Sequence, residues 1–410
     1  MQKILLLIAS LFYFNFILAE NEIKSWQGIH ETPLSRLEQQ FAEPPVEFAN
    51  HVIWGWEGKM DKKTICNDLD SIKKKGFRAV IFEAGYKLPF KYLSEEWFKA
   101  IRTGVVEAKK RDMKVWIIDE GKYPSGFAGG KFSQERPDLR MQALVIGDTI
   151  QIKRGEVMTN HKIAPEIISA VAVSTSGAPN RTVEINNGKI SFNAGLDDWK
   201  ILLVKSDFRT AVTRAVNNPN GGKDATNSLC DYLNPVAVQQ FIDWTHKQYK
   251  KYLGKELGTT VLGFRGDEPD YAHLPWTPSI VQTFKDTKGY DPTPYLASFF
   301  TASPTIQEQR VKADYWDVWS SLFATHFFKL QADWCAANGV AHITHLNKEH
   351  EMPACVKAEG DYFRALSKVQ IPGVDAIWNQ IWPSTLNDFP KLASSVAHVY
   401  GKPRAFSESF

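Results

Sequence analysis

The chain has little cysteine: its 410 residues include only four, at positions 66, 230, 335 and 355. None of them forms a C-x-x-C pair, and their spacing does not match that of a zinc site. The sequence therefore excludes a zinc-finger type of metal site and a C-x-x-C redox site. We expect four free, buried thiols rather than a disulfide framework.

A strong charge of either sign is also missing. The 49 lysine and arginine residues nearly balance the 46 aspartate and glutamate residues, which gives a formal net charge of +3. The densest basic cluster, Lys73–Lys75, ends a helical pattern, where cations interact favourably with the helix dipole. Because no basic stripe is interleaved with aromatic residues, the composition argues against nucleic-acid binding.

Long hydrophobic runs are absent except at the N-terminus. The basic residue Lys3 precedes an apolar stretch over residues 4–18, and the small residue Ala19 follows it. This order is typical of a cleaved signal peptide over residues 1–19. The run is short for a membrane-spanning helix and Asn15 interrupts it, although an uncleaved anchor is the alternative. We therefore expect an exported protein, periplasmic, on the outer surface or secreted, with no membrane span after cleavage.

Aromatic residues, by contrast, are abundant. The chain holds 13 Trp, 13 Tyr and 25 Phe, together 12% of its residues. Their flat, amphipathic rings pack in protein cores and also suit the faces of sugars. The composition thus favours a protein that handles carbohydrate, without establishing one.

From residue 49 onward, short apolar stretches alternate with segments of helical period. Seven stretches read as strands. The first six each begin a strand–helix unit, and the seventh is the last strand of the series. They are His51–Trp56, Phe77–Phe82, Lys114–Ile118, Thr260–Arg265, Ala341–His345, Val374–Trp378 and Arg404–Phe406. A closed parallel barrel of this kind needs eight units. The sequence therefore predicts an α/β protein with an incomplete (β/α)8 TIM-type barrel of seven strands; an open doubly wound sheet is the main alternative.

The predicted helices carry recognisable end signals. Ser94 and Asn234 suit the N-cap position, and Pro235 suits the first helical residue. The predicted helices are Asp61–Lys75, Ser94–Arg111, Pro235–Leu253, Pro278–Thr287, Ile306–Ala337, Gly360–Lys368 and Asp388–Tyr400.

The alternation breaks between about Met141 and Ser206, where short alternating stretches and turn signals indicate antiparallel strands. The expected strands there are Leu144–Ile152, Ile168–Val173, Thr182–Glu184, Lys189–Phe192 and Lys200–Val204. We therefore divide the chain into a signal peptide (1–19), a first barrel part (20–145), a β-rich insertion (146–206) and a second, truncated barrel part (207–410).

Acidic residues follow several of the predicted strands. Side chains at the C-terminal ends of barrel strands point into the mouth where substrates bind. The acids expected there are Glu83, Asp119, Glu120, Asp267, Glu268, Glu349 and Glu408, and His342, His345 and Asn347 follow the fifth strand. The aromatic residues expected there are Trp54, Trp56, Tyr123, Tyr271, Trp276, Trp378 and Trp382. Their repetition at several strand ends, rather than any single acid, indicates a site.

Two of these acids suit the hydrolysis of a glycosidic bond, which uses one protonated and one ionised carboxyl group. Glu268 stands before Pro269, which denies the chain a ladder hydrogen bond just after the acid. Glu408 lies between two serines whose hydroxyls can orient it. The alternatives are a helix cap or an ion pair for the segment Asp267-Glu268, and a frayed terminus for Glu408.

A loop rich in glycine and aromatic residues follows Asp119 and Glu120. Their carboxylates suit sugar hydroxyls or a hard cation such as Ca²⁺, although the loop has no EF-hand pattern. The segment Ser125–Gly130 lacks the lysine of a G-x-x-x-x-G-K-[ST] phosphate loop, so we reject phosphate binding.

Several of these segments, in this order, resemble the α-L-rhamnosidases of glycoside hydrolase family 106. The resemblance covers roughly residues 40 to 410. The segments that carry it are Trp54-Gly55-Trp56, Asp119–Gly126, Asp231–Pro235, Gly266–Pro269, Gly373–Trp378 and Ser407–Phe410.

The resemblance implies inverting hydrolysis of terminal α-L-rhamnosides by two glutamates on a (β/α)8 barrel, with a calcium ion near the sugar. The two glutamates match Glu268 and Glu408, with Glu349 in reserve; acid and base stay unassigned. Substrate contacts are expected from Trp54, Trp56, Asp119, Glu120, Tyr123, Asp267, His345, Glu349 and Trp378, while the metal ligands are unknown. The expected partner is an oligo- or polysaccharide that contains rhamnose.

Two alternatives stay open. One is a glycosidase of another specificity on the same barrel. The other is a fragment that binds carbohydrate without cleaving it, because family members are longer, with β-domains after the barrel.

Overall fold

The computed structural model describes residues 33–121, 123–209, 213–214, 223–224, 228–271, 274–302, 304–378, 380–381, 383–384 and 387–409. The predicted signal peptide and Trp382 lie outside these residues. Within the described ranges, no helix is both long and apolar enough to cross a bilayer. The four cysteines are free thiols, as predicted.

The chain forms two compact units. The first contains the residues up to Leu139 together with Thr210–Asp270 and Ala324–Phe410, and the second contains Arg140–Arg209 and Tyr271–Phe323. This division differs from the predicted boundaries, which assigned all residues after 206 to the barrel. The segment 271–323 supplies a strand that pairs with β4 (Gln142–Ile152) and helices that pack on one another, so its contacts lie in the second unit.

The first unit is built on a parallel sheet of seven strands within the described residues, in the order β1-β2-β3-β12-β14-β15-β16. The strands are β1 (His51–Trp56), β2 (Ala79–Ala84), β3 (Lys114–Ile118), β12 (Val261–Gly266), β14 (Ala341–Thr344), β15 (Ile371–Asp375) and β16 (Phe406–Glu408). Every pair of neighbours is parallel, as expected for a chain of strand–helix units.

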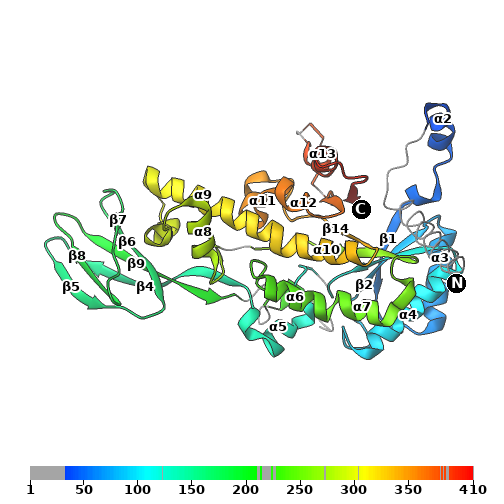
Figure 1. Cartoon of the computed structure of the whole chain (residues 1–410), viewed down its shortest axis with the longest axis horizontal. Coiled ribbons are helices and arrows are strands. Elements are labelled where there is room, and N and C mark those ends of the chain that lie inside the picture. Colours follow the sequence, from blue (N-terminus) through cyan, green and yellow to red (C-terminus); the bar gives the residue numbers. More distant parts are fainter. Residues whose placement is uncertain are drawn as a thin grey trace, which may run out of the picture. The chain divides into compact units, whose positions relative to one another are not determined.

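Helices connect the strands (Figure 1). They are α2 (Leu34–Ala42), α3 (Lys62–Lys74), α4 (Glu95–Lys110), α5 (Lys131–Glu135), α6 (Pro235–Trp244), α7 (His246–Leu253), α10 (Lys329–Ala337), α11 (Met352–Glu359), α12 (Tyr362–Leu366) and α13 (Leu392–Val399). The predicted caps Ser94 and Asn234 are confirmed, because their side chains accept backbone N–H bonds at the starts of α4 and α6. Asp61, predicted as the first residue of a helix, caps α3 in the same way.

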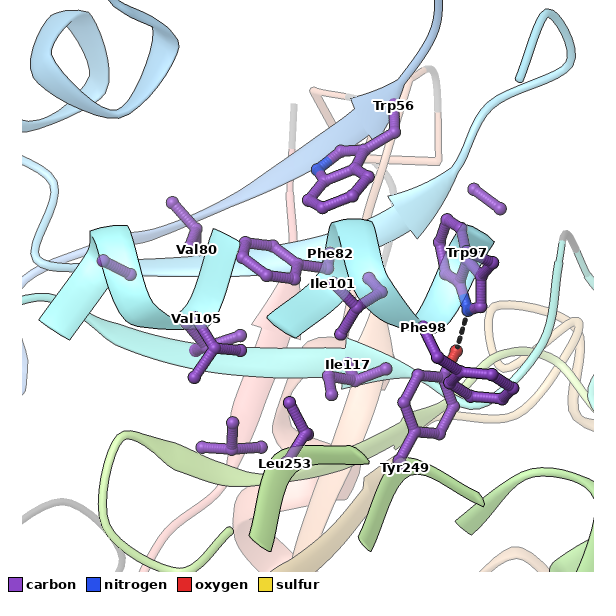
Figure 2. Packing of buried hydrophobic residues seen from close by; sticks show 14 of the residues in the cluster. Trp56, Val80, Phe82, Trp97, Phe98, Ile101, Val105, Ile117, Tyr249 and Leu253 are labelled. Atoms are coloured by element: carbon purple, nitrogen blue, oxygen red, sulfur yellow. Dashed lines mark hydrogen bonds between the residues drawn. The ribbon is translucent and has the colours of Figure 1, made fainter. Parts of the chain in front are cut away.

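The two faces of this sheet are packed by different apolar clusters. One cluster joins the sheet to α3, α4 and α7, and Figure 2 shows Trp56, Phe82 and Trp97 in it, with Trp97 Nε1 donating to Tyr249 Oη at 2.9 Å. The other face carries a second cluster, against which Ile53 from the first strand and Phe406 from the last both pack. Because both ends of the sheet reach one cluster, the sheet is curled, as in an incomplete barrel.

Glycine makes the packing of the last strand possible. Gly373 on β15 pairs with Phe406 on β16, and a Cβ at Gly373 would lie 2.2 Å from the Phe406 ring. The aromatic ring therefore covers the glycine of the neighbouring strand. This contact seats β16, which ends on Glu408.

The second unit contains antiparallel strands, as the sequence predicts. They are β4 (Gln142–Ile152), β5 (Val157–Lys162), β6 (Ile167–Ser174), β7 (Arg181–Thr182), β8 (Lys189–Asn193), β9 (Trp199–Phe208) and β13 (Pro275–Trp276). The strands β5 and β13 have no counterpart among the predicted ranges. Five form one sheet in the order β13-β4-β9-β6-β7, while β5 pairs with β8 (Figure 1). Helices α8 (Ile280–Lys288) and α9 (Ile306–Leu322) belong to the same unit.

Candidate active site

The C-terminal ends of the parallel strands bring ionisable side chains together in the first unit. Asp375 and Glu408 are the last residues of adjacent strands and are paired in register. Glu83 lies next to the end of β2, Asp267 follows β12 directly, and His345 follows β14 directly. This is the arrangement expected for the mouth of a βα barrel.

A buried guanidinium lies among these groups. Arg265 Nη2 contacts Glu408 Oε2 and lies 3.5 Å from Asp267 Oδ1. The same nitrogen lies 3.4 Å from His345 Nδ1, and burial together with this cation lowers the pKa of His345 to about 3. His345 is therefore neutral, with Nδ1 able to accept from Arg265 and Nε2–H directed at Asp267 Oδ1, 3.5 Å away.

Glu268 lies near the same imidazole. Its carboxylate forms a group with His345 and Asp375 in which one atom from each residue lies within 4.8 Å of the others. Burial, followed by repulsion from Asp267 and Asp375, raises the pKa of Glu268 to about 9. Its φ of +38° is unusual for a residue with a side chain, and such strain is concentrated at functional sites. Glu268 is thus a protonated carboxyl group at neutral pH.

Glu408 has a different environment. Burial raises its pKa to about 7, and the nearby Asp267 and Asp375 act in the same direction, while Arg265 acts against them. Glu408 therefore ionises more easily than Glu268. A pair of carboxyl groups whose environments separate their pKa values is what acid–base hydrolysis requires.

His345 also relates the two glutamates in space. Glu408 Oε2 lies 3.9 Å from His345 Nε2, and an oxygen of Glu268 lies within 4.8 Å of a nitrogen of the same ring. Both glutamates therefore lie close to one imidazole, at the ends of the parallel strands.

Ser125 fixes the chain next to Glu268. Its hydroxyl donates to Asp119 Oδ1 at 2.6 Å and accepts the N–H of Asp267 at 2.7 Å. Its own N–H donates to the carbonyl oxygen of Asp267 at 2.9 Å. The Gly-rich loop after β3 thus holds the backbone at Asp267, next to Glu268.

Asp119 and Glu120, predicted to contact substrate, are fully buried. The carboxylate of Glu120 accepts the N–H groups of Gly121 and Gly129, and it contacts that of Ala128 at 2.5 Å. Asp119 holds Ser125, and burial raises the pKa of Asp119 well above its usual range. These contacts argue against the prediction, because both carboxylates support the loop rather than face a sugar.

Glu349, the reserve candidate, is also almost fully buried. Its Oε1 accepts the N–H of Leu346 at 2.9 Å and that of Asp375 at 3.4 Å. Burial raises the pKa of Glu349 to about 8. It therefore ties the loop after β14 to the end of β15 and lies near Glu268, with a supporting role.

The predicted aromatic residues separate into buried and exposed groups. Trp56 is fully buried in the cluster beneath α4 (Figure 2), and Trp54 packs against that cluster, so the prediction that Trp56 stacks on sugar is wrong. Tyr271 and Trp276 are buried in the second unit. Trp378, in the loop after β15, is 71% exposed, and Tyr123 is half-buried. Among the described candidates, Trp378 and Tyr123 are the ones accessible to substrate.

The donor set can be tested against calcium. Among the described residues, two groups of three ligand atoms come within 4.8 Å of one another, Asp267–His345–Glu408 and Glu268–His345–Asp375. Both depend on an imidazole nitrogen, whereas Ca²⁺ takes six to eight oxygen ligands. The first group also has Arg265 as its counter-ion. These groups do not fit a calcium cage, so no step below involves a metal, and the calcium expectation stays a prediction.

Three participants were missing from the predicted site. Arg265 is not among the predicted site residues, because a single arginine in a sequence does not indicate a site. Asp375 was overlooked because the predicted strand ran to Trp378; a strand that ended at Asp375 would have placed this acid at the mouth. Glu359, fully buried with its Oε2 lacking a hydrogen bond among the described groups, lies in a helix that was not predicted.

Known proteins resemble the chain in sequence and fold. It is 23% identical to a curated protein of Formosa agariphila named "Putative beta-glucuronidase", over 92% of this chain and 35% of that protein. A solved rhamnosidase of Novosphingobium sp. PP1Y aligns with a TM-score of 0.64 at 15% identity, over 92% of this chain and 53% of that one. The chain thus spans about a third of the curated relative and about half of the solved structure.

A family model assigns the chain more directly. The model for alpha-L-rhamnosidase, glycoside hydrolase family 106, matches residues 156–410, which is more than half of the chain. This region includes Glu268, His345 and Glu408. The chain therefore belongs to glycoside hydrolase family 106, the alpha-L-rhamnosidase family.

Proposed function

We propose that the protein hydrolyses terminal α-L-rhamnosides with inversion, with Glu268 as general acid and Glu408 as general base. The observation that carries this proposal is the placement of both glutamates close to His345 at the strand ends, with pKa values that differ. Membership of the family supports rhamnose as the sugar. Exposed Trp378 offers a ring for the substrate, and Tyr123 stays a candidate contact.

In this mechanism, protonated Glu268 transfers its proton to the glycosidic oxygen as the bond from that oxygen to the anomeric carbon breaks. A water molecule attacks the anomeric carbon from the opposite face, and Glu408 takes the proton that this water loses. The products are the aglycone alcohol and rhamnose of inverted configuration. Asp267 and neutral His345 fix the groups around the two glutamates, with Asp375 beside them.

Export is part of the proposal and rests on the pattern of residues 1–19. It implies a rhamnose-containing oligo- or polysaccharide outside the cytoplasm as substrate. A mature protein that begins at Met1 would contradict it.

A panel of aryl glycosides tests the substrate. We expect hydrolysis of the α-L-rhamnoside, with β-anomeric rhamnose as the first product in NMR spectra. The curated relative is named "Putative beta-glucuronidase", so the panel includes a β-D-glucuronide as well as galactosides. Faster hydrolysis of another glycoside would replace rhamnose in the proposal. Binding of rhamnose in calorimetry without any turnover would favour the non-catalytic alternative.

The pKa values predict the pH dependence. Glu408 must be ionised, so kcat/KM should fall as the pH drops below about 7. Glu268 must be protonated, so kcat/KM should fall as the pH rises above about 9. We expect a bell-shaped profile with its maximum around pH 8. A maximum below roughly pH 6 would contradict the assignment of the two roles.

A further inference from the structure

Arg265 carries an almost fully enclosed charge at the mouth of the sheet. It lies on β12, and its side chain is 2% exposed. Its neighbour Phe264 packs in the cluster under α4 and α7, while Arg265 reaches residues at the ends of β14 and β16. The guanidinium is therefore directed into the curled sheet, towards the proposed catalytic pair.

Three carboxylates surround this one cation. Asp267 and Glu408 pair with it, and Glu83 on β2 adds a further negative charge nearby. A guanidinium taken out of water is tolerated only with partners of opposite charge. The partners come from β2, β12 and β16, so one side chain connects strands from both halves of the sheet.

The contacts differ between the two proposed catalytic residues. Glu408 is in direct contact with Arg265, whereas the charges that act on Glu268 are the carboxylates of Asp267, Asp375, Glu349 and Glu408. The cation therefore favours the charged form of Glu408, while the carboxylates disfavour that of Glu268. Arg265 distinguishes the two glutamates, which are otherwise both buried carboxyl groups.

We propose that Arg265 is a positioning residue that orients the carboxylate of Glu408 and keeps it ionised, so that this glutamate acts as the base. The proposal rests on the proposed function and adds to it the group that decides between acid and base. Among the described residues, the charged or titratable groups near Glu408 are Arg265, Asp267, Asp375, His345 and Glu268. Of these, Arg265 brings a positive charge, whereas His345 is neutral.

Arginine suits this role better than lysine. Its planar guanidinium meets Glu408, Asp267 and the Nδ1 of His345 through one nitrogen. A lysine would keep the charge, but its ammonium sits on a flexible stem and does not fix the directions of its N–H groups as the rigid guanidinium does. Arg265→Lys should therefore disturb the orientation of Glu408, whereas Arg265→Gln also removes the charge.

The test compares these variants by steady-state kinetics with the aryl α-L-rhamnoside. For Arg265→Lys we expect kcat to fall at least 10-fold with KM within about threefold of wild type. For Arg265→Gln we expect a larger fall and an acid limb displaced to higher pH, because loss of the cation raises the pKa of Glu408. Arg111→Lys is the matched control, since Arg111 also pairs with two carboxylates, Asp70 and Glu107, but joins helices α3 and α4 instead.

Each outcome supports or overturns the proposal. A folded Arg265→Gln protein with unchanged kcat and acid limb overturns it, as does full activity of Arg265→Lys. If neither variant folds, a crystal structure of the wild-type protein decides, and a guanidinium out of contact with Glu408 overturns the proposal. Failure of the proposed function gives a different result, because the wild-type protein itself would then not hydrolyse rhamnosides.

Discussion

Replacement of Glu268 by glutamine should lower kcat on aryl α-L-rhamnosides roughly 100- to 10,000-fold, the range typical of a lost general acid. Glutamine has the same shape but no carboxyl proton to give to the leaving oxygen. The fold should be retained, because burial already keeps Glu268 neutral and the change replaces one neutral group with another. Circular dichroism and thermal unfolding check that the fold is intact.

The leaving group makes this experiment more specific. An acidic phenol such as dinitrophenol needs little protonation, so Glu268→Gln should lose much less activity on its rhamnoside than on a simple phenyl rhamnoside. Glu408→Gln removes the base instead and should be impaired on both substrates alike. The reverse pattern would exchange the roles of the two glutamates.

Glu95→Gln is the control for the loss of a carboxylate. Glu95 lies at the start of α4, pairs with Lys99 and is 62% exposed, so its replacement should leave kcat unchanged. If Glu268→Gln retained more than about a tenth of wild-type kcat on phenyl rhamnoside, Glu268 would not be the general acid.

Much of the barrel could be predicted because its signals are local. The ranges of β1 and β3 match the predictions exactly in residue number, since each is a short apolar run bounded by turn or helix signals. The caps of α4 and α6 are recognisable from a single side chain each, Ser94 and Asn234. The order of strand and helix then requires a parallel sheet.

The misplaced elements depend on contacts that a linear pattern does not show. The strand expected at Val374–Trp378 begins instead at Ile371, because two poor strand formers are accepted there: Gly373 lies against the Phe406 ring, and Pro372 pairs with Thr344 on β14. The helix expected over Pro235–Leu253 breaks at Thr245, whose hydroxyl donates to the carbonyl oxygen of Phe241.

Side-chain direction limited the prediction of the site. Strands of a parallel sheet are covered on both faces, so their apolar residues give no sign of which face is which. Trp54 and Trp56 were therefore assigned to the mouth, although both belong to the cluster under the helices. Asp267, Glu268, His345 and Glu408 were placed correctly at the strand ends, because each follows or ends an apolar run.

Gly263→Ala should be the most damaging substitution in the barrel framework. Gly263 lies at a bulge in β12, where the register to β3 shifts, and pairs with Ala341 on β14. A Cβ at this position would lie 1.9 Å from the carbonyl oxygen of Ala341 and 2.8 Å from its carbonyl carbon. A neighbouring backbone cannot turn aside as a side chain can, so the two strands must separate.

The cost should exceed that of ordinary overpacking, which is about 1–3 kcal/mol, and is measured by urea unfolding. Gly55→Ala is the matched control on β1, because its Cβ would meet only the side-chain oxygen of Glu83, at 3.4 Å. Any Gly263→Ala protein that folds should also lose activity, since β12 carries Arg265 and leads into Glu268. Equal unfolding midpoints for the two variants would show that β12 and β14 lie farther apart than this distance. The position of Glu268 near His345 would then need another explanation.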